Sequence, residues 1–427
     1  MDICPAKFIS MQIPFDWTSW VNIPSNSDFS IQNIPFGIFK TASKSPRAGI
    51  AIGDKILDLQ WLVENKFIDI PLHTVNQLYL NDFIGLGKPI TNKVRYDIAT
   101  LLKADNTSLK NHADIRNGLI DSKEASLLMP VKVGDYTDFY SSKDHAYNVG
   151  VMFRDPANAL LPNWKHLPVG YHGRASSILP SGASVYRPKG QTKPVETEPP
   201  VFGPTKRLDF ELEVGFIIGK GNELGDSIST AQAEDHIFGL ILFNDLSARD
   251  IQQWEYVPLG PFLAKNFASV ISPWVVTLEA LDPFRVDGEV QDPKVLPYLS
   301  FEGKKNYDIQ LEVSITPQGG QEQTICHSNF KFMYWNMCQQ LAHHTVNGCN
   351  MNIGDILASG TISGPTEDSY GSMLELGWKG TKPIPMNDGS TRLFFFFFDS
   401  NTLRGYAMKD GVRVGFGESV TKILPAK

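Results

Sequence analysis

The chain has 427 residues, of which 39 are Lys or Arg and 46 are Asp or Glu, so its formal net charge is −7. This acidic balance, without a block of basic residues, argues against binding to nucleic acid or to an anionic membrane surface, because both depend on clustered cations. Hydrophobic residues make up 42% and charged residues 20% of the chain, which excludes wholesale disorder and favours a globular protein with a small-molecule substrate.

Cysteine usage and the N-terminal segment indicate a cytoplasmic protein. The four cysteines, Cys4, Cys326, Cys338 and Cys349, form no CxxC pair, so neither a disulfide framework nor a thiolate zinc site is expected. Charged residues and prolines interrupt the apolar residues of the first 17 positions, which predicts no secretion signal. The apolar runs fall far short of the roughly 20 residues that a membrane-spanning helix needs.

The N-terminal third predicts a small β-rich unit. Short apolar runs separated by turn residues over 36–59 are typical of a β-meander. Val94, Ile98, Leu101 and Leu102 recur at helical spacing and predict a helix, with Thr91 as its N-terminal cap. The polar stretch 103–124 leads to an expected boundary, which divides the chain into an N-terminal domain, 1–130, and a C-terminal catalytic domain, 131–427.

The next informative segment is the expected strand 208–218, where apolar residues alternate with Asp209, Glu211 and Glu213. Period-two alternation puts these carboxylates on one face of the strand. That face is either exposed to solvent or close to a cation, because neighbouring like charges repel each other. A second strand over 237–243 leads to Asp245. An all-oxygen ligand set of this kind suits Mg²⁺ or Ca²⁺ better than zinc.

Four further patterns have structural as well as functional interpretations. The segment 247–256 predicts a short helix with Arg249, Gln252 and Tyr256 on one face, which is either an ordinary amphipathic face or a set of donors for an oxyanion. His145 lies in a polar, aromatic segment that is either a surface loop or a functional loop. The glycines of GKGNELG, 219–225, lack the spacing of a dinucleotide-binding loop and predict a hairpin turn. The run Phe394 to Phe398 predicts a buried strand.

Several longer motifs together resemble the fumarylacetoacetate hydrolase family. They are GDYTDFYSS (134–142), NWKHLPVGYHGRASS (163–177), LDFELEVGF (208–216), NDLSARDIQQWEYVPLGPFLAK (244–265), HHTVNGCN (343–350) and LASGTISGP (357–365). The resemblance runs in order from about residue 130 to 385. It implies a fold that is mainly β with some α, in which a small N-terminal SH3-like β-barrel precedes a large mixed β-sandwich or roll that carries the catalytic site.

The resemblance also implies a role for each matching residue. The implied ligands of a divalent cation, Ca²⁺ and/or Mg²⁺, are Asp138, Glu211, Glu213 and Asp245. Lys265 and Ser269 match positions around an accessory cation, where threonine is usual at the second of them. The implied substrate-binding residues are Tyr140, Arg154, Tyr171, Gln252, Tyr256 and Thr361. The implied catalytic residues are His145 as general base, Glu375 as the carboxylate that orients it, and Arg249, Gln252 and Lys265 as stabilisers of an oxyanion.

These roles predict an enzyme that hydrolyses a carbon–carbon bond of 4-fumarylacetoacetate, giving fumarate and acetoacetate in the final step of phenylalanine and tyrosine catabolism. The resemblance further implies a homodimer. One alternative is a related hydrolase or decarboxylase acting on acylpyruvates; the N-terminal unit and the His145 segment favour the first activity. Another alternative is a catalytically silent scaffold protein. Retention of His145, Glu375, Lys265 and the four carboxylates argues against a silent protein.

Overall fold

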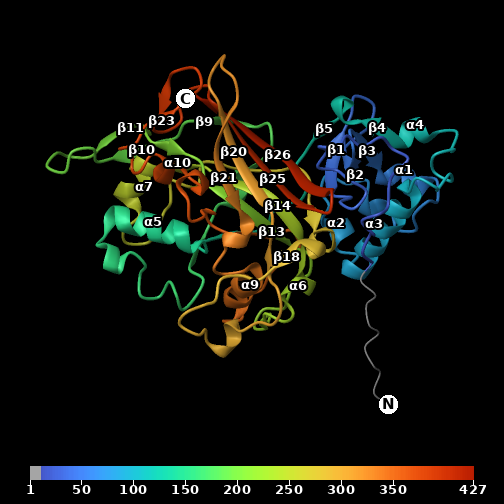
Figure 1. The fold of residues 1–427 in the computed structure, drawn as a ribbon, viewed down its shortest axis with the longest axis horizontal. Helices are drawn as coiled ribbons and strands as arrows, with labels where there is room; N and C mark the ends of the chain where they lie inside the picture. Colours follow the sequence, from blue (N-terminus) through green and yellow to red (C-terminus); the bar gives the residue numbers. More distant parts are fainter. Residues whose placement is uncertain (1–10) are drawn as a thin grey trace.

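The computed structural model describes residues 11–427, so Cys4 and the first ten residues of the N-terminal segment lie outside the described residues. The predicted class is confirmed: the chain is mainly β with some α, and a small N-terminal β unit packs beside a larger part that contains two extensive sheets (Figure 1). No helix within residues 11–427 combines the length and the apolar character needed to cross a lipid bilayer.

The N-terminal unit is a five-stranded antiparallel half-barrel. Its strands run in the order β4 (Leu119–Asp121), β3 (Lys55–Asp58), β2 (Arg47–Ile52), β1 (Phe36–Lys40) and β5 (Ser126–Leu127). The meander predicted over 36–59 corresponds to β1, β2 and β3 and is confirmed. The sequence did not predict β4 or β5, which are short edge strands that follow a polar segment and carry little alternation of their own.

Helices cover this half-barrel: α1 (Leu59–Glu64), α2 (Asn81–Ile84), α3 (Lys88–Leu102) and α4 (Ile115–Gly118). The helix predicted from apolar spacing is α3, and its Val94, Ile98 and Leu102 side chains are buried. The prediction that Thr91 caps this helix is wrong. Pro89 in the first turn favours an earlier start at Lys88, and the Thr91 hydroxyl donates instead to the Lys88 carbonyl within that turn.

An eight-stranded sheet forms the centre of the larger part. Its order is β7 (Gly170–His172), β6 (Tyr136–Phe139), β22 (Ile356–Ala358), β13 (Leu212–Ile218), β14 (Ile237–Asp245), β16 (Ser269–Ile271) and β8 (Ile178–Pro180), with β17 (Val276–Thr277) also paired to β14. The strands predicted over 208–218 and 237–243 are present. The first is interrupted at Phe210–Glu211, so that β12 (Leu208–Asp209) pairs separately with β15 (Ser247–Ala248).

A second, five-stranded sheet packs on one face of the first. Its order is β21 (Gln323–Asn329), β20 (Gln310–Thr316), β25 (Ser400–Lys409), β26 (Val412–Leu424) and β9 (Ser184–Tyr186). Leu240 and Leu242 of β14 belong to the core shared with this sheet, whereas Ile241 and Phe243 belong to the core shared with the N-terminal unit. Because both faces of β14 are covered, all of its residues are buried, which explains the uninterrupted apolar run.

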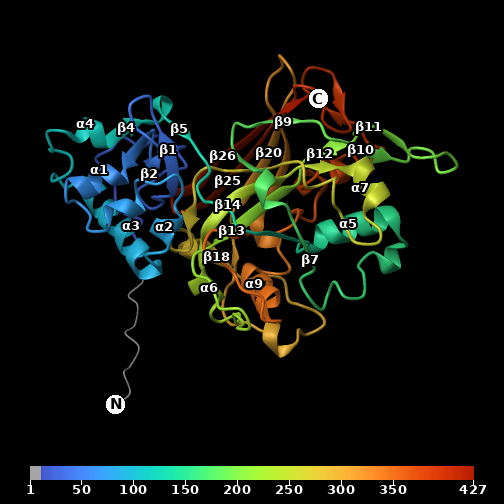
Figure 2. The same ribbon diagram turned by 180° about the vertical axis from the view of Figure 1, so that it is seen from behind.

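The remaining elements are short. The paired strands are β10 (Lys189–Thr192) with β11 (Val201–Pro204), β18 (Arg285–Val286) with β19 (Asn306–Tyr307), and β23 (Ile384–Pro385) with β24 (Thr391–Arg392). The helices are α5 (Lys143–Phe153), α6 (Ala233–His236), α7 (Arg249–Glu255), α8 (Leu278–Leu281), α9 (Met337–Thr345) and α10 (Met373–Leu376). Helices α5, α7 and α10 gather at the end of the molecule away from the half-barrel (Figures 1 and 2).

The prediction of a buried strand over Phe394 to Phe398 is wrong. The segment forms a turn between β24 and β25, in which Phe394 and Phe395 are buried while Phe396 and Phe397 are about half exposed. Cations cover the two exposed rings: the Arg392 guanidinium lies 4.4 Å from the centroid of Phe396, and that of Arg187 lies 4.9 Å from the centroid of Phe397. These contacts account for aromatic rings at the surface.

A candidate active site around a buried carboxylate cluster

Four carboxylates meet where strands of the central sheet end. They are Asp138 in β6, Glu211 just before β13, Glu213 in β13 and Asp245 at the end of β14, and each offers an oxygen within 4.8 Å of the others. All four side chains are buried. The alternative of a solvent-exposed carboxylate face over 208–218 is therefore wrong, and the interpretation that this face lies close to a cation remains.

The electrostatics of the cluster favour an added positive charge. Burial and the neighbouring Asp245 raise the pKa of Asp138 to about 8. Burial and the charges of Asp138 and Asp245 also raise the pKa of Glu213 well above its usual value. Two buried oxygens here, Oδ1 of Asp138 and Oε1 of Glu213, have no hydrogen-bond partner within residues 11–427. Unpaired carboxylate oxygens among like charges are what a hard cation would satisfy, so the residues fit a divalent metal ion.

Protein donors hold the other oxygen of each of these two carboxylates. The Tyr136 hydroxyl donates to Asp138 Oδ2 at 2.9 Å, and the Tyr171 hydroxyl shares its single proton between the same atom, at 3.1 Å, and Asp245 Oδ2, at 3.0 Å. The backbone N–H of Gly360 donates to Glu213 Oε2 at 3.1 Å. In both Asp138 and Glu213, one carboxylate oxygen thus accepts hydrogen bonds from the protein, while the other has no partner within the described residues.

Two buried cations partly offset the negative charge. The Lys265 ammonium contacts Glu211 and lies 2.7 Å from Asp245 Oδ2. Arg249, the first residue of α7, donates from Nη1 to Glu211 Oε1 at 2.7 Å and from Nε to Asp209 Oδ2 at 2.8 Å. Although burial opposes it, these carboxylates hold the pKa of both Lys265 and Arg249 above its usual value. Both side chains therefore stay charged within the site.

One nitrogen of the Arg249 guanidinium remains available as a hydrogen-bond donor. Its Nη2 is buried and has no hydrogen-bond partner among the residues that the structure describes, and its Nη1 contacts Gln252 Oε1 at 3.3 Å. Arg249 and Gln252 thus share the face of α7 that the sequence predicted, but the exposed amphipathic alternative does not hold for Arg249, which is buried. Tyr256, on the same predicted face, follows the helix and is 52% exposed.

Ser269, at the start of β16, donates through its hydroxyl to Asp245 Oδ1 at 2.8 Å. Lys265 and Ser269 therefore both contact the same carboxylate. The accessory cation that the resemblance implied at these two positions stays a prediction, because both polar groups already have a protein partner.

His145 and Glu375 form a second buried group beside the cluster. His145 Nδ1 lies 2.7 Å from Glu375 Oε2, and both side chains are buried. The expectation of a loop at His145 is wrong. The segment forms helix α5, because the Ser142 hydroxyl accepts from the His145 backbone N–H and caps the helix. When Nδ1 carries the proton donated to Glu375, Nε2 is the nitrogen that can accept another.

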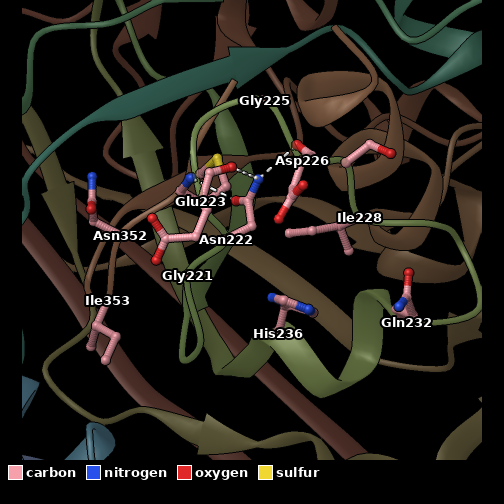
Figure 3. Close-up of a pocket in the computed structure, with 12 residues that line it drawn as sticks. Gly221, Asn222, Glu223, Gly225, Asp226, Ile228, Gln232, His236, Asn352 and Ile353 are labelled. Atoms are coloured by element: carbon pink, nitrogen blue, oxygen red, sulfur yellow. Dashed lines mark hydrogen bonds between the residues drawn. The ribbon is translucent and has the colours of Figure 1, made fainter. Parts of the chain in front are cut away.

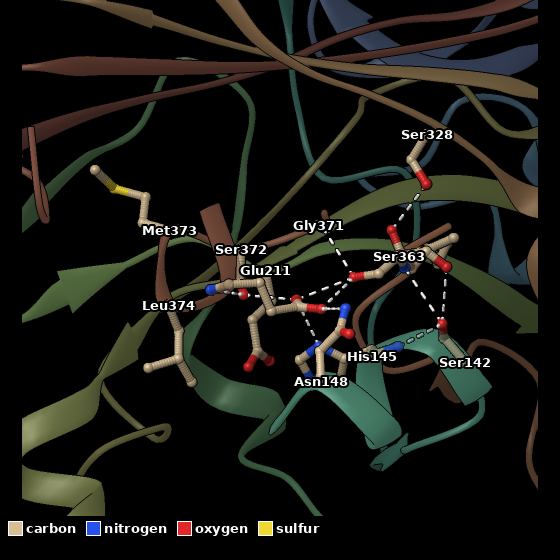
Figure 4. Close-up of polar contacts among 12 residues, drawn as sticks. Ser142, His145, Asn148, Glu211, Ser328, Ser363, Gly371, Ser372, Met373 and Leu374 are labelled. Atoms are coloured by element: carbon tan, nitrogen blue, oxygen red, sulfur yellow. Dashed lines mark hydrogen bonds and ion pairs between the residues drawn. The ribbon is translucent and has the colours of Figure 1, made fainter. Parts of the chain in front are cut away.

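Further donors contact Glu375, and Figure 4 labels two of them, Asn148 and Ser372. Asn148 Nδ2 donates to Oε1 at 3.0 Å, and the Ser372 hydroxyl donates to Oε2 at 2.8 Å. Although burial acts in the opposite direction, His145, Asn148 and Ser372 hold the pKa of Glu375 below its usual value. Glu375 is therefore an ionised acceptor at neutral pH.

Of the other predicted substrate-binding residues, Tyr140, Tyr171 and Thr361 differ from Arg154 in their surroundings. Tyr171 lies in the carboxylate cluster, and Tyr140 packs edge-on against His145 with ring centroids 5.2 Å apart. Thr361 is buried, and its hydroxyl has no hydrogen-bond partner in the described part of the chain. Arg154 is not brought into the cluster. It is exposed, and its guanidinium donates to the backbone oxygens of Asn158 and Ala159 in the following loop.

Sequence reasoning assigned no role to several residues that hold this site in place. Asp209 was recognised only as part of an alternating strand, yet it accepts from Arg249 and from the backbone N–H groups of Met373 and Leu374 in α10. Tyr136 and Asn148 carried no signal of their own. The spacing Ser372-x-x-Glu375, however, is a recognised pattern at helix starts and could have located α10.

A separate cavity of about 930 Å³ opens beside the glycine-containing loop 219–225 (Figure 3). Gly221, Gly225, His236 and Met351 are among its lining residues, and none of the predicted site residues lies in its wall. The loop joins β13 to α6 and β14, as expected for a turn between antiparallel strands and not for a dinucleotide-binding helix start. The cavity is thus distinct from the carboxylate cluster.

Comparisons with known proteins give one consistent answer. The family model described as "Fumarylacetoacetate (FAA) hydrolase C-terminal" matches residues 136–392, and the one described as "Fumarylacetoacetase N-terminal" matches residues 32–130. The chain is 51% identical to the fumarylacetoacetase of Homo sapiens over 415 residues, covering 96% of this chain and 99% of that protein. It is 48% identical to the fumarylacetoacetase of Arabidopsis thaliana, covering 96% and 98%.

Among solved structures, the chain is similar in fold to a fumarylacetoacetate hydrolase from the psychrophile Exiguobacterium antarcticum. The TM-score is 0.53 at 16% sequence identity, and the match covers 92% of this chain and 100% of that one. At this identity the likeness concerns the fold alone.

Proposed function

Because the chain belongs to the fumarylacetoacetate hydrolase family, we propose that its buried carboxylate cluster, together with His145 and Glu375, hydrolyses 4-fumarylacetoacetate to fumarate and acetoacetate. The chain is a hydrolase of this family, and it cleaves a carbon–carbon bond in a ketonic substance. In the cell this is the last step of phenylalanine and tyrosine breakdown.

One observation supports the assignment to these particular residues: within residues 11–427, four buried polar atoms without a hydrogen-bond partner belong to the carboxylate cluster, to Arg249, which is bonded to Glu211, and to Thr361, which follows the Gly360 N–H that donates to Glu213. They are Asp138 Oδ1, Glu213 Oε1, Arg249 Nη2 and Thr361 Oγ1. Leaving such a group unpaired costs about 1–3 kcal/mol. Such unpaired atoms persist in a native protein where a ligand or an ion forms the missing contacts. The combination of two acceptors, a cationic donor and a hydroxyl suits a metal ion together with an oxygen-rich substrate.

The reaction needs an activated water, a stabilised oxyanion and a delocalised leaving group. His145, held by Glu375, takes a proton from water as the water oxygen attacks the carbonyl carbon. Arg249, through its free Nη2, stabilises the oxyanion that forms, with Lys265 and Gln252 beside it. The carbon–carbon bond then breaks, its electron pair leaves with acetoacetate as an enolate, and protonation of that carbanion completes the hydrolysis.

Asp138, Glu211, Glu213 and Asp245 would hold the metal ion, and we propose Mg²⁺ or Ca²⁺ because every side-chain ligand is a carboxylate oxygen. The ion would supply Lewis-acid stabilisation of negative charge on the diketone oxygens. We propose that Tyr140, Tyr171 and Thr361 orient the substrate. Arg154 and Tyr256, which are exposed, stay predictions as substrate-binding residues.

The test of the activity is the loss of 4-fumarylacetoacetate in the presence of the purified protein, with and without a chelator, and in parallel the loss of an acylpyruvate. We expect turnover of the first compound and its loss on chelation. Turnover of the acylpyruvate alone would favour the related hydrolase activity. Absence of turnover of both, by a folded and metal-loaded protein, would favour a silent scaffold.

For the metal site we expect Glu213→Gln to lower the divalent-ion content of the purified protein, because the variant loses an unpaired carboxylate oxygen. In the native protein, Mg²⁺ or Ca²⁺ at about 100 times its Kd should add about 2.7 kcal/mol to the free energy of unfolding and raise Tm. Glu234→Gln is the matched control, since Glu234 pairs with Arg285 and Lys305 elsewhere. Native metal content in Glu213→Gln would contradict the ligand assignment.

We further propose a cytoplasmic homodimer. The described cysteines, Cys326, Cys338 and Cys349, are free thiols, which suits a reducing compartment. Exposed apolar side chains lie on β11 and on the segment after α7, and they include Phe202, which is 75% exposed, and Leu259, which is 96% exposed. A second copy of the chain would cover such a surface. Sedimentation equilibrium at the mass of a single chain would contradict this proposal.

A further inference from the structure

Ser363 is a fully buried residue that contacts both oxygens of Glu375. It lies in the segment that follows β22, beside Ser142 (Figure 4). Its hydroxyl oxygen is 2.9 Å from Glu375 Oε1 and 2.9 Å from Oε2. Neither the predicted roles nor the proposed chemistry makes use of it.

The direction of this hydrogen bond is determined by a second contact. The backbone N–H of Gly371 donates to the Ser363 hydroxyl oxygen at 2.9 Å. A serine hydroxyl has one proton, and with Gly371 as its donor the proton is directed to the Glu375 carboxylate. Since Glu375 also accepts from His145, Asn148 and Ser372, donors surround the carboxylate on both oxygens.

Ser363 also connects the two helices that carry the proposed general base and its partner. Ser142 caps α5 and Ser372 caps α10, and His145 and Glu375 each lie three residues after the capping serine. The Ser142 hydroxyl donates to the Ser363 carbonyl at 3.0 Å, while the Ser363 side chain reaches Glu375. A shift of Ser363 would therefore disturb both helix starts.

We propose that Ser363 is a positioning residue for the hydrolysis: its hydroxyl fixes the orientation of the Glu375 carboxylate, and through it the ring of His145. This inference rests on the proposed function, in which His145 takes the proton from water. Ser363 touches neither water nor substrate in this scheme. Its effect is on how well the base is aligned, so it should alter kcat much more than KM.

The test compares Ser363→Ala with Ser328→Ala. Ser328 is also buried, and its hydroxyl donates to the carbonyl of Ile362, the residue before Ser363, without reaching Glu375. We expect Ser363→Ala to lower kcat about 10-fold or more with KM nearly unchanged, as expected for the loss of a hydrogen bond to a charged group. Ser328→Ala should retain a kcat near the native value.

A second readout does not depend on turnover. The Nδ1–H proton of His145, bonded to Glu375, should give a low-field proton NMR signal that shifts or is lost in Ser363→Ala and stays unchanged in Ser328→Ala. If Ser363→Ala does not fold, Ser363→Cys keeps the volume with a weak donor and should act in the same direction. A native kcat and an unchanged signal in the Ser363 variant would overturn the proposal. If the native protein does not hydrolyse fumarylacetoacetate, the proposed function fails, while the NMR signal still tests the contact.

Discussion

Replacing His145 by alanine is expected to lower kcat for fumarylacetoacetate about 10²- to 10⁴-fold, the usual contribution of a general base. The reason is its position: His145 is buried, its Nδ1 is bonded to Glu375 at 2.7 Å, and it lies on the first turn of α5 beside the carboxylate cluster. The alanine variant keeps the helix and the Ser142 cap, so its fold should survive. Steady-state kinetics together with circular dichroism would measure both effects.

Two further variants separate the general base from an effect on packing. Glu375→Gln keeps the size of the side chain but removes the negative charge that stabilises a protonated His145, so kcat should fall without loss of the fold. His166→Ala removes an exposed histidine and should leave kcat unchanged. A native kcat in His145→Ala would mean that another group activates the water.

The strands of the catalytic part were predictable because their pattern is local. The alternation over 208–218 and the apolar run over 237–243 place Glu213 and Asp245 on neighbouring strands of a sheet, and β13 and β14 pair accordingly. Spacing alone did not determine whether the carboxylate face of the first strand is exposed to solvent or lies close to a cation. Burial decides this question, and burial depends on the second sheet and the half-barrel, which no local pattern describes.

The pairing of His145 with Glu375 could not come from periodicity, because 230 positions separate them. It came from the family resemblance. The residues that hold the site, such as Ser363 and Asp209, are common polar types whose importance lies only in what they contact. For the run Phe394 to Phe398, by contrast, the composition predicted a structure that does not form. Its composition is typical of a buried strand, but a turn fixed by Asp399, which accepts from Arg392 and the Phe396 N–H, brings two of the rings to the surface.

Arg249 pairs with two buried carboxylates and is also the proposed stabiliser of the oxyanion, so its replacement should affect both stability and activity. In Arg249→Met, the buried Asp209 and Glu211 lose a cationic partner. Breaking a buried ion pair typically costs about 3–5 kcal/mol of the free energy of unfolding. Part of this cost is avoided at Glu211, which keeps Lys265, so the lower end of the range is expected. Urea denaturation in the presence of a chelator would measure it without a contribution from bound ion.

The value of kcat/KM should fall independently of that loss, because Arg249 Nη2 is the buried donor that we propose for the oxyanion. Arg249→Lys keeps a positive charge and most of the stability. A lysine cannot reproduce the planar fork that reaches Asp209, Glu211 and the oxyanion together, so kcat/KM should still fall about 10²-fold or more.

Arg392→Met is the matched control for Arg249→Met. Arg392 forms an equally buried pair with Asp399, at 2.9 Å and 3.0 Å, away from the carboxylate cluster. Its loss should cost comparable stability and leave kcat/KM nearly native at a temperature where the variant stays folded. If Arg249→Lys were as active as the native protein, Arg249 would act only as a structural partner of Asp209 and Glu211, and Lys265 would be the remaining cation to stabilise the oxyanion.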